Sequence, residues 1–562
     1  MIFVMDTADT LNVSSILSGL SKTLGTRAAL IDVARGQLRS ASFAELEDEV
    51  NDAAMILRRA GVRALDVVLI YVPLQRELIS LLLAVFRTGA QALFIDPTYG
   101  PGKVWHCLRL AKPKFLIIDS RLQAVAIAAP LLEMLGMRGL IIYSAAKKGP
   151  ISSKLFIVKS AKRERVECSQ TGLLSQDSFS PERFSPERFS PAHPALITFT
   201  SGSTGKPKGI VRSHGFLTSQ SSLLQKTLPA DPSGKNCGGP YNVMTTLPMF
   251  VLSALAAGQT AIIPAAGEEE LLNQLKNLTI DRLLAAPRSI ENICRMLANV
   301  SLKLPLVQQV IVGGGPVFPD LVATVCKTMP DAQIITVYGS TEAEPICHSI
   351  IKPPSQPLLI RLIKRERGLP LGRPIEEITL RVIDPRALGQ RQFFTAEQFD
   401  ALQLQADREG EIVVAGAHVV AGYLGGVGDS ETKLNVGGRI FHRTGDAGYV
   451  TSEGKVFLTG RIGNGVVNGA ETVYPLTVEL MAMDNQGVER CAFVALGNKN
   501  ILALQLRKGF NKEDVEAQLR HQFAQSKIKV DRFVVVNAMP VDERHQTKIV
   551  YAKLKKQLRF VS

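Results

Sequence analysis

A short loop rich in glycine, serine and threonine is the segment of this sequence best suited to chemistry. Thr200 to Gly209, TSGSTGKPKG, contains seven Gly, Ser or Thr residues and two lysines, Lys206 and Lys208. Such residues are poor packing material, because glycine costs backbone entropy and hydroxyl groups cannot build an apolar core. Amides, hydroxyls and lysine ammonium groups are instead suited to phosphate oxygens. The loop therefore indicates that a bound ligand compensates for the backbone entropy lost when this loop is ordered.

The loop does not satisfy the P-loop pattern GxxxxGK[ST], because Pro207 follows Lys206 and the glycine spacing differs. Ile197 to Lys208, ITFTSGSTGKPK, instead resembles position by position the phosphate loop of the AMP-forming superfamily of acyl-CoA synthetases, adenylation domains and luciferases. The resemblance implies that ATP and AMP bind here, with Thr200 also among the catalytic candidates. The implied nucleotide-binding residues of the loop are Thr200, Ser201, Gly202, Ser203, Thr204, Gly205, Lys206 and Lys208.

Two stretches farther along resemble the adenine site of the same superfamily. VGGGPV, Val312–Val317, is similar to its adenine-facing turn, where glycines let a flat base lie against the backbone. VYGSTEAEP, Val337–Pro345, looks like its Tyr-Gly-x-Thr-Glu motif, in which the tyrosine stacks on adenine. The resemblance therefore assigns these residues to the nucleotide: Gly313, Gly314, Gly315, Pro316, Tyr338 and Gly339.

The same tyrosine motif carries the implied phosphate and metal contacts. The resemblance assigns Thr341 to the α-phosphate and Glu342 to Mg²⁺, and makes both of them catalytic candidates. A single carboxylate together with substrate phosphates is a reasonable Mg²⁺ site, because this ion keeps several waters and needs few protein ligands. We therefore expect ATP and Mg²⁺ to be used together.

Two C-terminal stretches complete the resemblance. HRTGDAGYVTSEGKVFLTGR, His442–Arg461, is similar to the Thr-Gly-Asp and Gly-Arg pair, which implies that Asp446 accepts both ribose hydroxyls and that Arg461 assists. MPVDERHQTKIVYAKL, Met539–Leu554, has Lys548 where the superfamily carries a mobile catalytic lysine. The chemistry needs such a cation, because a carboxylate must approach an α-phosphate against anion–anion repulsion.

The elements that would position these residues alternate along the chain. Ser42–Gly61 has the pattern of an amphipathic helix, with Ser42 as N-cap and Glu45 three residues later. Buried strands and further helices then alternate from DVVLIYVP through QIITVYGST. This order predicts an α/β fold with a largely parallel sheet.

The resemblance implies two domains within the α/β class. Residues 1–459 would form a large N-terminal domain of layered α/β subdomains, with an exposed linker at about 169–194 that holds the repeat FSPERFSPERFSP. A hinge at 460–463 would lead into a small mobile α+β lid at 464–562. Such a lid can exclude water from a reactive mixed anhydride and present a second face for a second step.

The positive charge of the chain limits the kinds of binding partner that the sequence predicts. The 562-residue chain has a net charge of +14 and a pI near 9.4, and much of the excess lies in Lys147–Arg165. We interpret this stretch first as a solvated surface loop and second as a peripheral contact to an anionic membrane. Nucleic acid ranks last, because no aromatic interleaving or binding motif accompanies the charge, so we expect no nucleic-acid partner.

The location expected from the sequence is the cytoplasm. The seven cysteines are scattered and form no CxxC pair, so neither a disulfide framework nor a zinc site is indicated. The N-terminus does not have the pattern of a signal peptide. No uninterrupted apolar run is long enough for a transmembrane segment.

The reaction implied by the resemblance is activation of a carboxylic acid by Mg·ATP, which gives an acyl-adenylate and pyrophosphate. Phe250 and Val251, in TTLPMFVLSAL, would line the substrate pocket and favour an apolar, medium- or long-chain acyl group, including a β-hydroxy fatty acid. Acyl transfer as in fatty acid–CoA ligases is the first candidate for the second step, with coenzyme A as acceptor.

The sequence departs from thioester-forming members on the side that serves coenzyme A. Gly463, Val467 and Ala470 stand where those members carry an Asp or Lys, a lysine and a glycine, and Val251 stands where many have histidine. These departures, with PVDERHQTKI, are similar to the olefin-pathway β-lactone synthetases, in which the substrate's own hydroxyl attacks the acyl-adenylate. β-Lactone formation without coenzyme A is therefore the second candidate.

A candidate of another class is a nucleotide-binding scaffold that has lost catalysis. Such a protein would retain the fold, but only chemistry requires Glu342 and Lys548. Both are present, which favours an enzyme over a scaffold.

Overall fold

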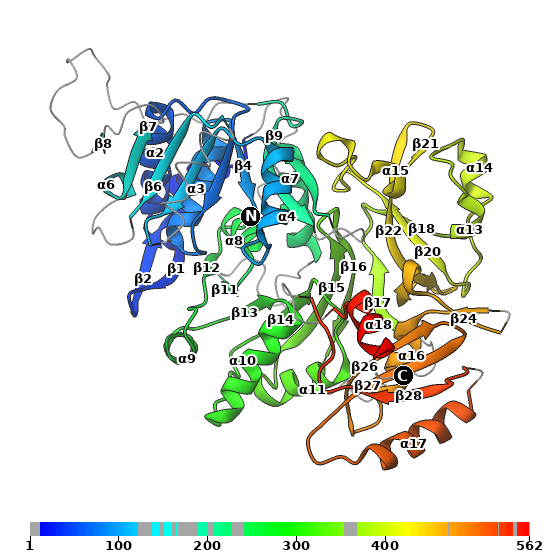
Figure 1. Ribbon diagram of the computed structural model, residues 1–562. Coiled ribbons are helices and arrows are strands. Elements are labelled where there is room, and N and C mark those ends of the chain that lie inside the picture. The colour runs from blue at the N-terminus through cyan, green and yellow to red at the C-terminus, as the bar shows by residue number, and fades with distance from the viewer. Residues whose placement is uncertain are drawn as a thin grey trace, which may run out of the picture. The chain divides into compact units, whose positions relative to one another are not determined.

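The computed structural model describes residues 12–121, 136–144, 151–159, 165–166, 189–200, 206–227, 241–352, 368–469, 471–526, 528–542 and 548–560. The chain divides into two compact units. Figure 1 labels their helices and strands. The first unit is Met1–Leu284 with Gly422–Asp429, and the second is Ala285–Ala421 with Ser430–Ser562. Of the candidate site residues, Ser201, Gly202, Ser203, Thr204 and Gly205 lie outside the described residues, as does Ala470.

The first unit contains an eight-stranded sheet in the order β10-β9-β4-β3-β5-β6-β7-β8. Its central pairs, from β9 to β6, are parallel, and its outer pairs are antiparallel. The strands are β3 (Val67–Tyr71), β4 (Gln91–Phe94), β5 (Phe115–Asp119), β6 (Gly139–Tyr143), β7 (Leu155–Lys159), β8 (Arg165–Val166), β9 (Pro194–Thr200) and β10 (Lys208–Ser213).

A second set of strands in this unit runs in the order β13-β11-β12-β1-β2, parallel except for the β1–β2 hairpin. These strands are β1 (Ala28–Ala34), β2 (Gln37–Ser42), β11 (Asn242–Thr245), β12 (Thr260–Ile262) and β13 (Arg282–Ala285). The helices of the unit are α1 (Ser15–Leu24), α2 (Phe43–Arg59), α3 (Arg76–Arg87), α4 (Pro101–Ala111), α6 (Ile151–Lys154), α7 (His214–Thr227), α8 (Pro248–Ala256) and α9 (Glu268–Asn277).

Helix α2 shows why these residues form these elements. Ser42 accepts from the backbone N–H of Glu45, and the Glu45 carboxylate accepts from the N–H of Ser42, which is the predicted capping box. The buried residues of α2 recur with the period of a helix and include Leu46, Val50 and Leu57. This face packs against α1 and α3, and alternation of helices and strands continues along the unit as predicted.

The second unit begins with two parallel strands, β14 and β15, and continues as an antiparallel sheet in the order β15-β16-β17-β23-β22-β20-β18, with β21 and β19 at its side. These strands are β14 (Gln309–Gly313), β15 (Gln333–Ser340), β16 (Ala343–Ile351), β17 (Leu369–Pro374), β18 (Thr379–Ile383), β19 (Phe393–Phe394), β20 (Gly410–Ala415), β21 (Lys433–Val436), β22 (Arg439–Val450) and β23 (Val456–Arg461). Its helices before residue 460 are α10 (Pro287–Asn299), α11 (Pro319–Thr328), α13 (Pro385–Leu388), α14 (Ala396–Asp400) and α15 (Asp429–Thr432).

The C-terminal part of the second unit is a small α+β module. It holds a hairpin, β24 (Val466–Asn468) and β25 (Glu471–Val473), and a three-stranded sheet of β26 (Val488–Leu496), β27 (Lys499–Leu506) and β28 (Arg532–Val535). Helices α16 (Pro475–Ala482) and α17 (Lys512–Ala524) share a core with one face of this sheet, and α18 (Tyr551–Arg559) shares a core with the other. Cys491 and Phe493 point into the first core and Ala492 and Val494 into the second, as strand alternation requires.

The structure confirms the predicted α/β class with a sheet-rich N-terminal part and a smaller α+β C-terminal part. The domain limits at 459 and 464 stay predictions. Most of the predicted linker at about 169–194, namely residues 169–188, lies outside the described residues; in its described end, Phe189 stacks on His193 with ring centroids 4.3 Å apart.

The basic stretch Lys147–Arg165 is not entirely the solvated loop that the sequence suggested. Ile151–Lys154 forms α6 and Leu155–Lys159 forms β7. Lys154 is buried, and its ammonium pairs with the Glu77 carboxylate at 3.1 Å. A buried charge needs such a partner, so Lys154 acts within the fold rather than on its surface.

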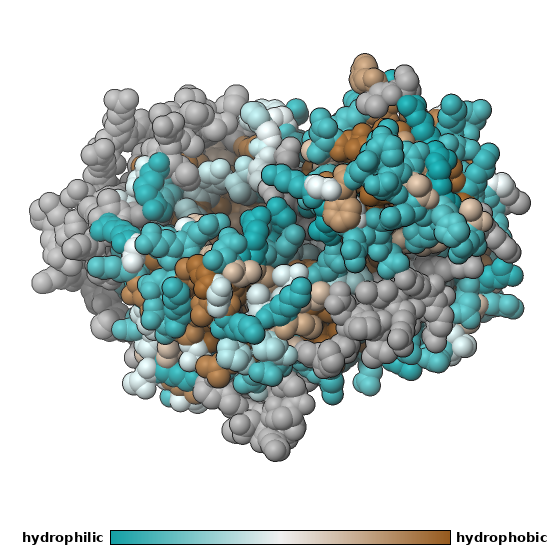
Figure 2. Space-filling view, turned by 90° about the horizontal axis from the view of Figure 1, so that it is seen from below, coloured by the Kyte–Doolittle hydropathy of each residue, from teal (hydrophilic) through white to brown (hydrophobic). Residues whose placement is uncertain are grey.

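Hydrophilic residues predominate on the face that Figure 2 shows. The most exposed large hydrophobic side chains of the described part are Phe560, Phe393 and Val467, which belong to three different segments. Isolated exposed hydrophobic residues are ordinary and indicate no docking surface. Within the described residues, no helix combines the length and the apolar character needed to cross a bilayer.

Candidate active site

The ends of the phosphate loop lie on two paired strands of the first unit. Strands β9 and β10 are antiparallel, and Thr200 at the end of β9 lies opposite Lys208 at the start of β10. The two described residues that flank the loop therefore lie side by side at one end of this strand pair. Lys206 is exposed, and the carbonyl of Pro207 lies 3.1 Å from Nε2 of His106 on α4.

The two lysines of the loop have different surroundings. Lys208 is only 6% exposed, and its ammonium lies 5.1 Å from the centroid of the Tyr423 ring, in the segment Gly422–Asp429 that completes the first unit. Backbone pairing between Ile210 and Tyr423 holds this segment against β10. A cation over an aromatic face is a favourable contact, so Lys208 has a packing role that the sequence did not reveal. Its contact with ATP stays a prediction.

The predicted adenine turn and Tyr338 meet in the second unit. Gly313 ends β14 and pairs with Val337 of the parallel strand β15, directly before Tyr338. A Cβ atom on Gly313 would lie 3.1 Å from the carbonyl oxygen of Val337, and Gly314 adopts a φ of +80°. Because the carboxyl ends of parallel strands meet at one edge of a sheet, the turn and Tyr338 share that edge.

Asp446 joins Tyr338 to Arg461. Asp446 on β22 lies opposite Arg461 on β23, and the Arg461 guanidinium donates to Oδ1 at 2.6 Å. The Tyr338 hydroxyl donates to Oδ2 at 2.7 Å. Gly445, with a φ of +69°, makes the bend before Asp446, and the Thr444 hydroxyl accepts from the N–H of Asp446 at 3.0 Å.

The electrostatics of this cluster follow from burial and from the carboxylate. Burial, together with the charge of Asp446, raises the pKa of Tyr338 well above its ordinary value, so the phenol stays protonated and donates. The charge of Asp446 also raises the pKa of Arg461. A carboxylate has about four acceptor positions. Each Asp446 oxygen therefore retains room for one more donor, which is what two ribose hydroxyls require.

The backbone around Glu342 is braced by a segment that the sequence analysis did not single out. The carbonyl of Glu342 accepts from the N–H of Val420 at 2.8 Å, and Ala343 pairs with Val419. Nε2 of His418, fully buried, lies 2.8 Å from the carbonyl of Pro345. No local pattern predicts these contacts, because the paired residues are more than 70 positions apart in the chain.

The brace is itself held by a buried lysine. The ammonium of Lys433 donates to the carbonyl of Val420 and lies 3.4 Å from Nδ1 of His442, and both side chains are buried. Thr341 and Glu342 are half-buried in the turn between β15 and β16. The position of the Glu342 backbone is thus set by tertiary contacts with Val419 and Val420.

Lys548 lies on a short hairpin of the C-terminal module. Its N–H donates to the Asp542 carboxylate at 2.8 Å, and its carbonyl accepts from the Asp542 N–H at 2.8 Å. Residues 543–547 between them lie outside the described residues. Lys548 is exposed, which is compatible with its predicted approach to a substrate.

The structure therefore joins Gly313, Tyr338, Asp446 and Arg461 in one cluster of the second unit, with Glu342 in the turn that follows Tyr338. Thr200, Lys206 and Lys208 belong to the first unit, and each unit is described by itself. The roles inferred for all of these residues stay predictions.

The comparison with known proteins decides the class. The pattern of the family described as AMP-binding enzyme matches residues 21–424, well over half of the chain. The chain belongs to the AMP-binding enzyme family. It is therefore an adenylate-forming ligase that uses ATP, as the sequence motifs indicated.

Among curated relatives of this AMP-binding enzyme are two described as olefin β-lactone synthetases. The protein from Stenotrophomonas maltophilia is 27% identical over 503 residues, which cover 85% of this chain and 84% of that protein. The protein from Xanthomonas campestris pv. campestris is 27% identical over 546 residues, which cover 91% and 90%. A protein described as indoleacetate–CoA ligase, from Aromatoleum aromaticum, is 25% identical and covers 81% and 80%.

Solved structures confirm the fold. ATP-bound MatB from Rhodopseudomonas palustris superposes with a TM-score of 0.73 at 20% identity, and covers 98% of this chain and 100% of that one. The anthranilate CoA ligase AuaEII, in complex with anthranoyl-AMP, has a TM-score of 0.75 at 16% identity, with 99% of both chains covered. At these identities the likeness concerns the fold alone.

The described residues fit a Mg²⁺ site with a single protein carboxylate. Among the described residues there is no group of three or more His, Cys, Asp or Glu side chains that could hold a metal. A metal at Glu342 would therefore depend on one carboxylate plus phosphate oxygens and waters, which is a usual arrangement for Mg²⁺.

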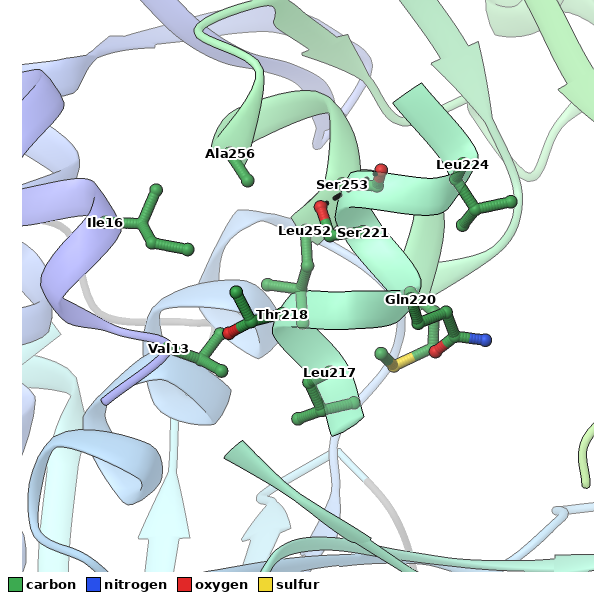
Figure 3. Close-up of a pocket in the computed structure, with 11 residues that line it drawn as sticks. Val13, Ile16, Leu217, Thr218, Gln220, Ser221, Leu224, Leu252, Ser253 and Ala256 are labelled. Carbon is green, nitrogen blue, oxygen red and sulfur yellow. Dashed lines mark hydrogen bonds between the residues drawn. The ribbon is translucent and has the colours of Figure 1, made fainter. Parts of the chain in front are cut away.

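A narrow cavity lies between α1, α7 and α8 in the first unit (Figure 3). Its water-accessible volume is about 20 Å³, and most of its lining is apolar. The Ser221 hydroxyl of α7 donates to the Ser253 hydroxyl of α8 at 3.3 Å across it. The lining residues are Val13, Ile16, Leu217, Thr218, Gln220, Ser221, Leu224, Met249, Leu252, Ser253 and Ala256.

The predicted pocket residues Phe250 and Val251 do not line this cavity. Both are buried on α8, and Val251 has no exposed surface. The cavity is lined instead by Met249, Leu252 and Ala256, which lie on one face of α8 because residues three and four positions apart are neighbours on a helix. The role of Phe250 and Val251 in substrate binding stays a prediction.

Proposed function

We propose that this AMP-binding enzyme activates a β-hydroxy fatty acid with Mg·ATP and closes the resulting acyl-adenylate to a β-lactone without coenzyme A. The observation that carries the proposal is the altered hinge-side sequence, with Gly463, Val467 and Ala470 where thioester-forming members carry charged residues and a glycine. Val467 is 73% exposed, so the valine has not taken the place of the lysine in order to fill the core.

In the first step a carboxylate oxygen of the acid attacks the α-phosphorus of ATP. The bond between the α-phosphorus and the bridging oxygen breaks, and pyrophosphate leaves with the electron pair. Tyr338 would stack on adenine, and Asp446 would accept the ribose hydroxyls through the acceptor positions that Tyr338 and Arg461 leave open. Lys548 would lie between the two anions and reduce their repulsion.

Mg²⁺ would be held by Glu342 and phosphate oxygens, and when bound it supplies positive charge that stabilises the pyrophosphate leaving group. Every other contribution comes from the chain. Lys206, which is exposed at the end of the phosphate loop, is available to the phosphates. The backbone brace at Val420 would keep Glu342 in place as the phosphates move.

In the second step the β-hydroxyl oxygen of the same substrate attacks the acyl carbon. A new C–O bond closes the four-membered ring, the bond from the acyl carbon to the AMP oxygen breaks, and the hydroxyl proton is released. AMP leaves, and no thiol, water or redox partner is consumed. The attack is intramolecular, so its effective concentration is high.

An apolar substrate suits the described helix α8. Phe250, Val251 and Leu252 are all buried there, so both the cavity face and the opposite face of the helix are apolar. A cavity of about 20 Å³ does not hold a long chain as it stands, so we propose the substrate's apolar character and leave its chain length to experiment.

The two relatives described as olefin β-lactone synthetases, which match along most of their length, support this proposal over thioester formation. Coenzyme A ligase activity remains the alternative, because relatives described as CoA ligases also match.

A matched pair of acids tests the proposal. The full chain is incubated with Mg·ATP and either β-hydroxypalmitate or palmitate, without coenzyme A, and both pyrophosphate exchange and AMP release are measured. We expect exchange with both acids but sustained AMP release only with β-hydroxypalmitate, because palmitoyl-adenylate has no internal nucleophile. AMP release that requires coenzyme A with both acids would establish the ligase alternative, and no exchange with either acid would favour the scaffold.

A further inference from the structure

The described strands of the hairpin that presents Lys548 are short and comprise Pro540–Asp542 and Lys548–Val550. The hairpin is closed by the two hydrogen bonds between Asp542 and Lys548, by the N–H of Val550 to the carbonyl of Pro540 at 2.8 Å, and by pairing of Val541 with Ile549. A two-stranded hairpin of this size is marginally stable in water. Its position must therefore be set by the elements that it joins.

The hairpin runs directly into α18, whose first residue is Tyr551. The Tyr551 hydroxyl donates to Oε1 of Glu479 on α16 at 2.5 Å, and the same oxygen accepts from the N–H of Phe493 on β26 at 3.1 Å. One buried carboxyl group thus ties the start of α18 to both α16 and the three-stranded sheet.

Burial makes this contact unusual. Glu479 is 6% exposed, and burial raises its pKa to about 7 although Tyr551 and the Phe493 N–H lower it. The titratable groups facing it are Tyr551 on α18 and Cys491 on β26, whose thiol donates to the Glu479 carbonyl at 3.4 Å. Burial raises the pKa of both groups well above its ordinary value, so both stay neutral near pH 7. No cation of the described residues contributes to the pKa of Glu479, and a buried carboxyl without such a partner is costly when ionised.

We propose that the Glu479–Tyr551 hydrogen bond positions Lys548 for adenylation. Tyr551 lies three residues after Lys548, and the Val550 N–H bonded to Pro540 lies between them. Fixing the Tyr551 hydroxyl on Glu479 therefore fixes the end of the hairpin. Glu479 and Tyr551 are positioning residues that act through Lys548, and the inference rests on the proposed role of Lys548.

The two ends of α18 are held by different kinds of contact. Leu554 and Leu558 bury the helix against Ala492 and Val494 of the sheet, and that apolar contact holds α18 on the module. The Tyr551 hydroxyl adds a fixed rotation and register at the N-terminal end of the helix. Loss of the hydroxyl alone should therefore leave α18 docked but loosen the hairpin.

The kinetic test uses Tyr551→Phe in the full chain, with pyrophosphate exchange on β-hydroxypalmitate as readout. We expect kcat to fall about 10- to 100-fold, the scale on which a small misplacement acts, with the KM for ATP nearly unchanged. Phe523→Leu, in the core on the opposite face of the sheet, serves as control for general destabilisation. A parallel loss in Phe523→Leu, or a Tyr551→Phe variant with wild-type kcat, would overturn the proposal.

Lys548→Ala separates this inference from the proposed function. If Lys548→Ala retains exchange, the role of Lys548 is wrong and the positioning question falls with it. If Lys548→Ala loses exchange while Tyr551→Phe does not, the proposed function stands and the positioning role alone is wrong.

A second readout does not depend on activity. Hydrogen exchange of the amides of Asp542 and Val550 should be several-fold faster in Tyr551→Phe than in the wild type, while amides of β27 stay protected. Glu479→Gln keeps an acceptor oxygen without a charge, so it should keep slow hairpin exchange and flatten the pH profile of kcat near pH 7. Glu479→Leu should lose both. Equal exchange in all four proteins would contradict the positioning role.

Discussion

The Tyr338 hydroxyl donates a hydrogen bond to the carboxylate of Asp446, although the two residues are 108 positions apart in the chain. The bond joins the strand that carries the predicted adenine platform to the strand that carries the predicted ribose acceptor. Arg461, which pairs with Asp446 on the neighbouring strand, also donates to its carboxylate. Two parts of the predicted nucleotide site are thus joined by hydrogen bonds between side chains of the protein itself.

Asp446→Asn should weaken AMP binding about 10- to 100-fold, because hydrogen bonds to a charged group contribute about 1.5–3 kcal/mol each. The change keeps the shape of the side chain but removes the charge and replaces one acceptor by a donor. Isothermal titration with AMP measures the effect. Asp400→Asn, which disrupts an exposed pair with Arg381 at 2.6 Å, is the control and should bind AMP as the wild type does. An unchanged Kd in Asp446→Asn would remove Asp446 from the ribose site.

Glu342→Gln should raise the Mg²⁺ concentration needed for half-maximal pyrophosphate exchange by about tenfold or more, since the amide is a much weaker ligand for a hard cation. Glu376→Gln is a matched control, because Glu376 is an exposed carboxylate in the same unit. The readout is a Mg²⁺ titration at saturating ATP. The same Mg²⁺ dependence in both variants would exclude Glu342 as the metal ligand.

Gly428→Ala should destabilise the protein by about 1 kcal/mol more than Gly437→Ala does, at the low end of the cost of overpacking, because the atoms met belong to the flexible Lys208 side chain. Both glycines have a positive φ, +96° and +56°, so both substitutions cost backbone strain of about 1–2 kcal/mol. Only at position 428 would the added Cβ also meet a side chain, at 2.8 Å from Cδ of Lys208, whereas at 437 no atom of the described residues lies within 4 Å. Chemical denaturation compares the two. Equal losses would show that Lys208 is not packed against this segment in solution.

The pKa of Glu479 predicts a pH dependence of stability. Its folded-state pKa is about 7 against an ordinary 4.5, so between these values the unfolded chain ionises while the folded protein stays protonated. The free energy of unfolding should therefore decrease as pH rises from 4.5 to 7, by at most about 3 kcal/mol, with no further effect above or below that window.

Glu479→Gln should remove this part of the pH dependence. The control is Glu489→Gln, an exposed carboxylate on the same strand that carries Phe493, which should keep the slope. Denaturant unfolding at several pH values measures both. A wild-type slope in Glu479→Gln would mean that this carboxyl is ionised throughout the range.

Local patterns in the sequence predicted much of the fold. Ser42 and Glu45 form the capping box that their spacing indicated, and the alternation of apolar strands with helices gave the parallel sheets. The positions of Gly313 and Tyr338 at one sheet edge also follow from the motif order, because Gly313 ends one buried strand and Tyr338 lies near the end of the next.

Contacts between distant segments could not be predicted in this way. Lys208 and Lys154 look like surface charges in the sequence, yet both are buried by segments that are far away in the chain. The brace of Glu342 by Val420 depends on Lys433, whose buried ammonium has no local signature. Long aliphatic stems allow a lysine to be packed while its charge finds a partner, so residue type alone does not reveal burial.

Mass spectrometry of the product made from β-hydroxypalmitate and Mg·ATP, in the absence of any thiol, is the decisive experiment on lactone formation. We expect a product one water lighter than the acid, formed together with equimolar AMP and pyrophosphate. Absence of that product, with an acyl thioester formed only once coenzyme A is added, would contradict lactone formation.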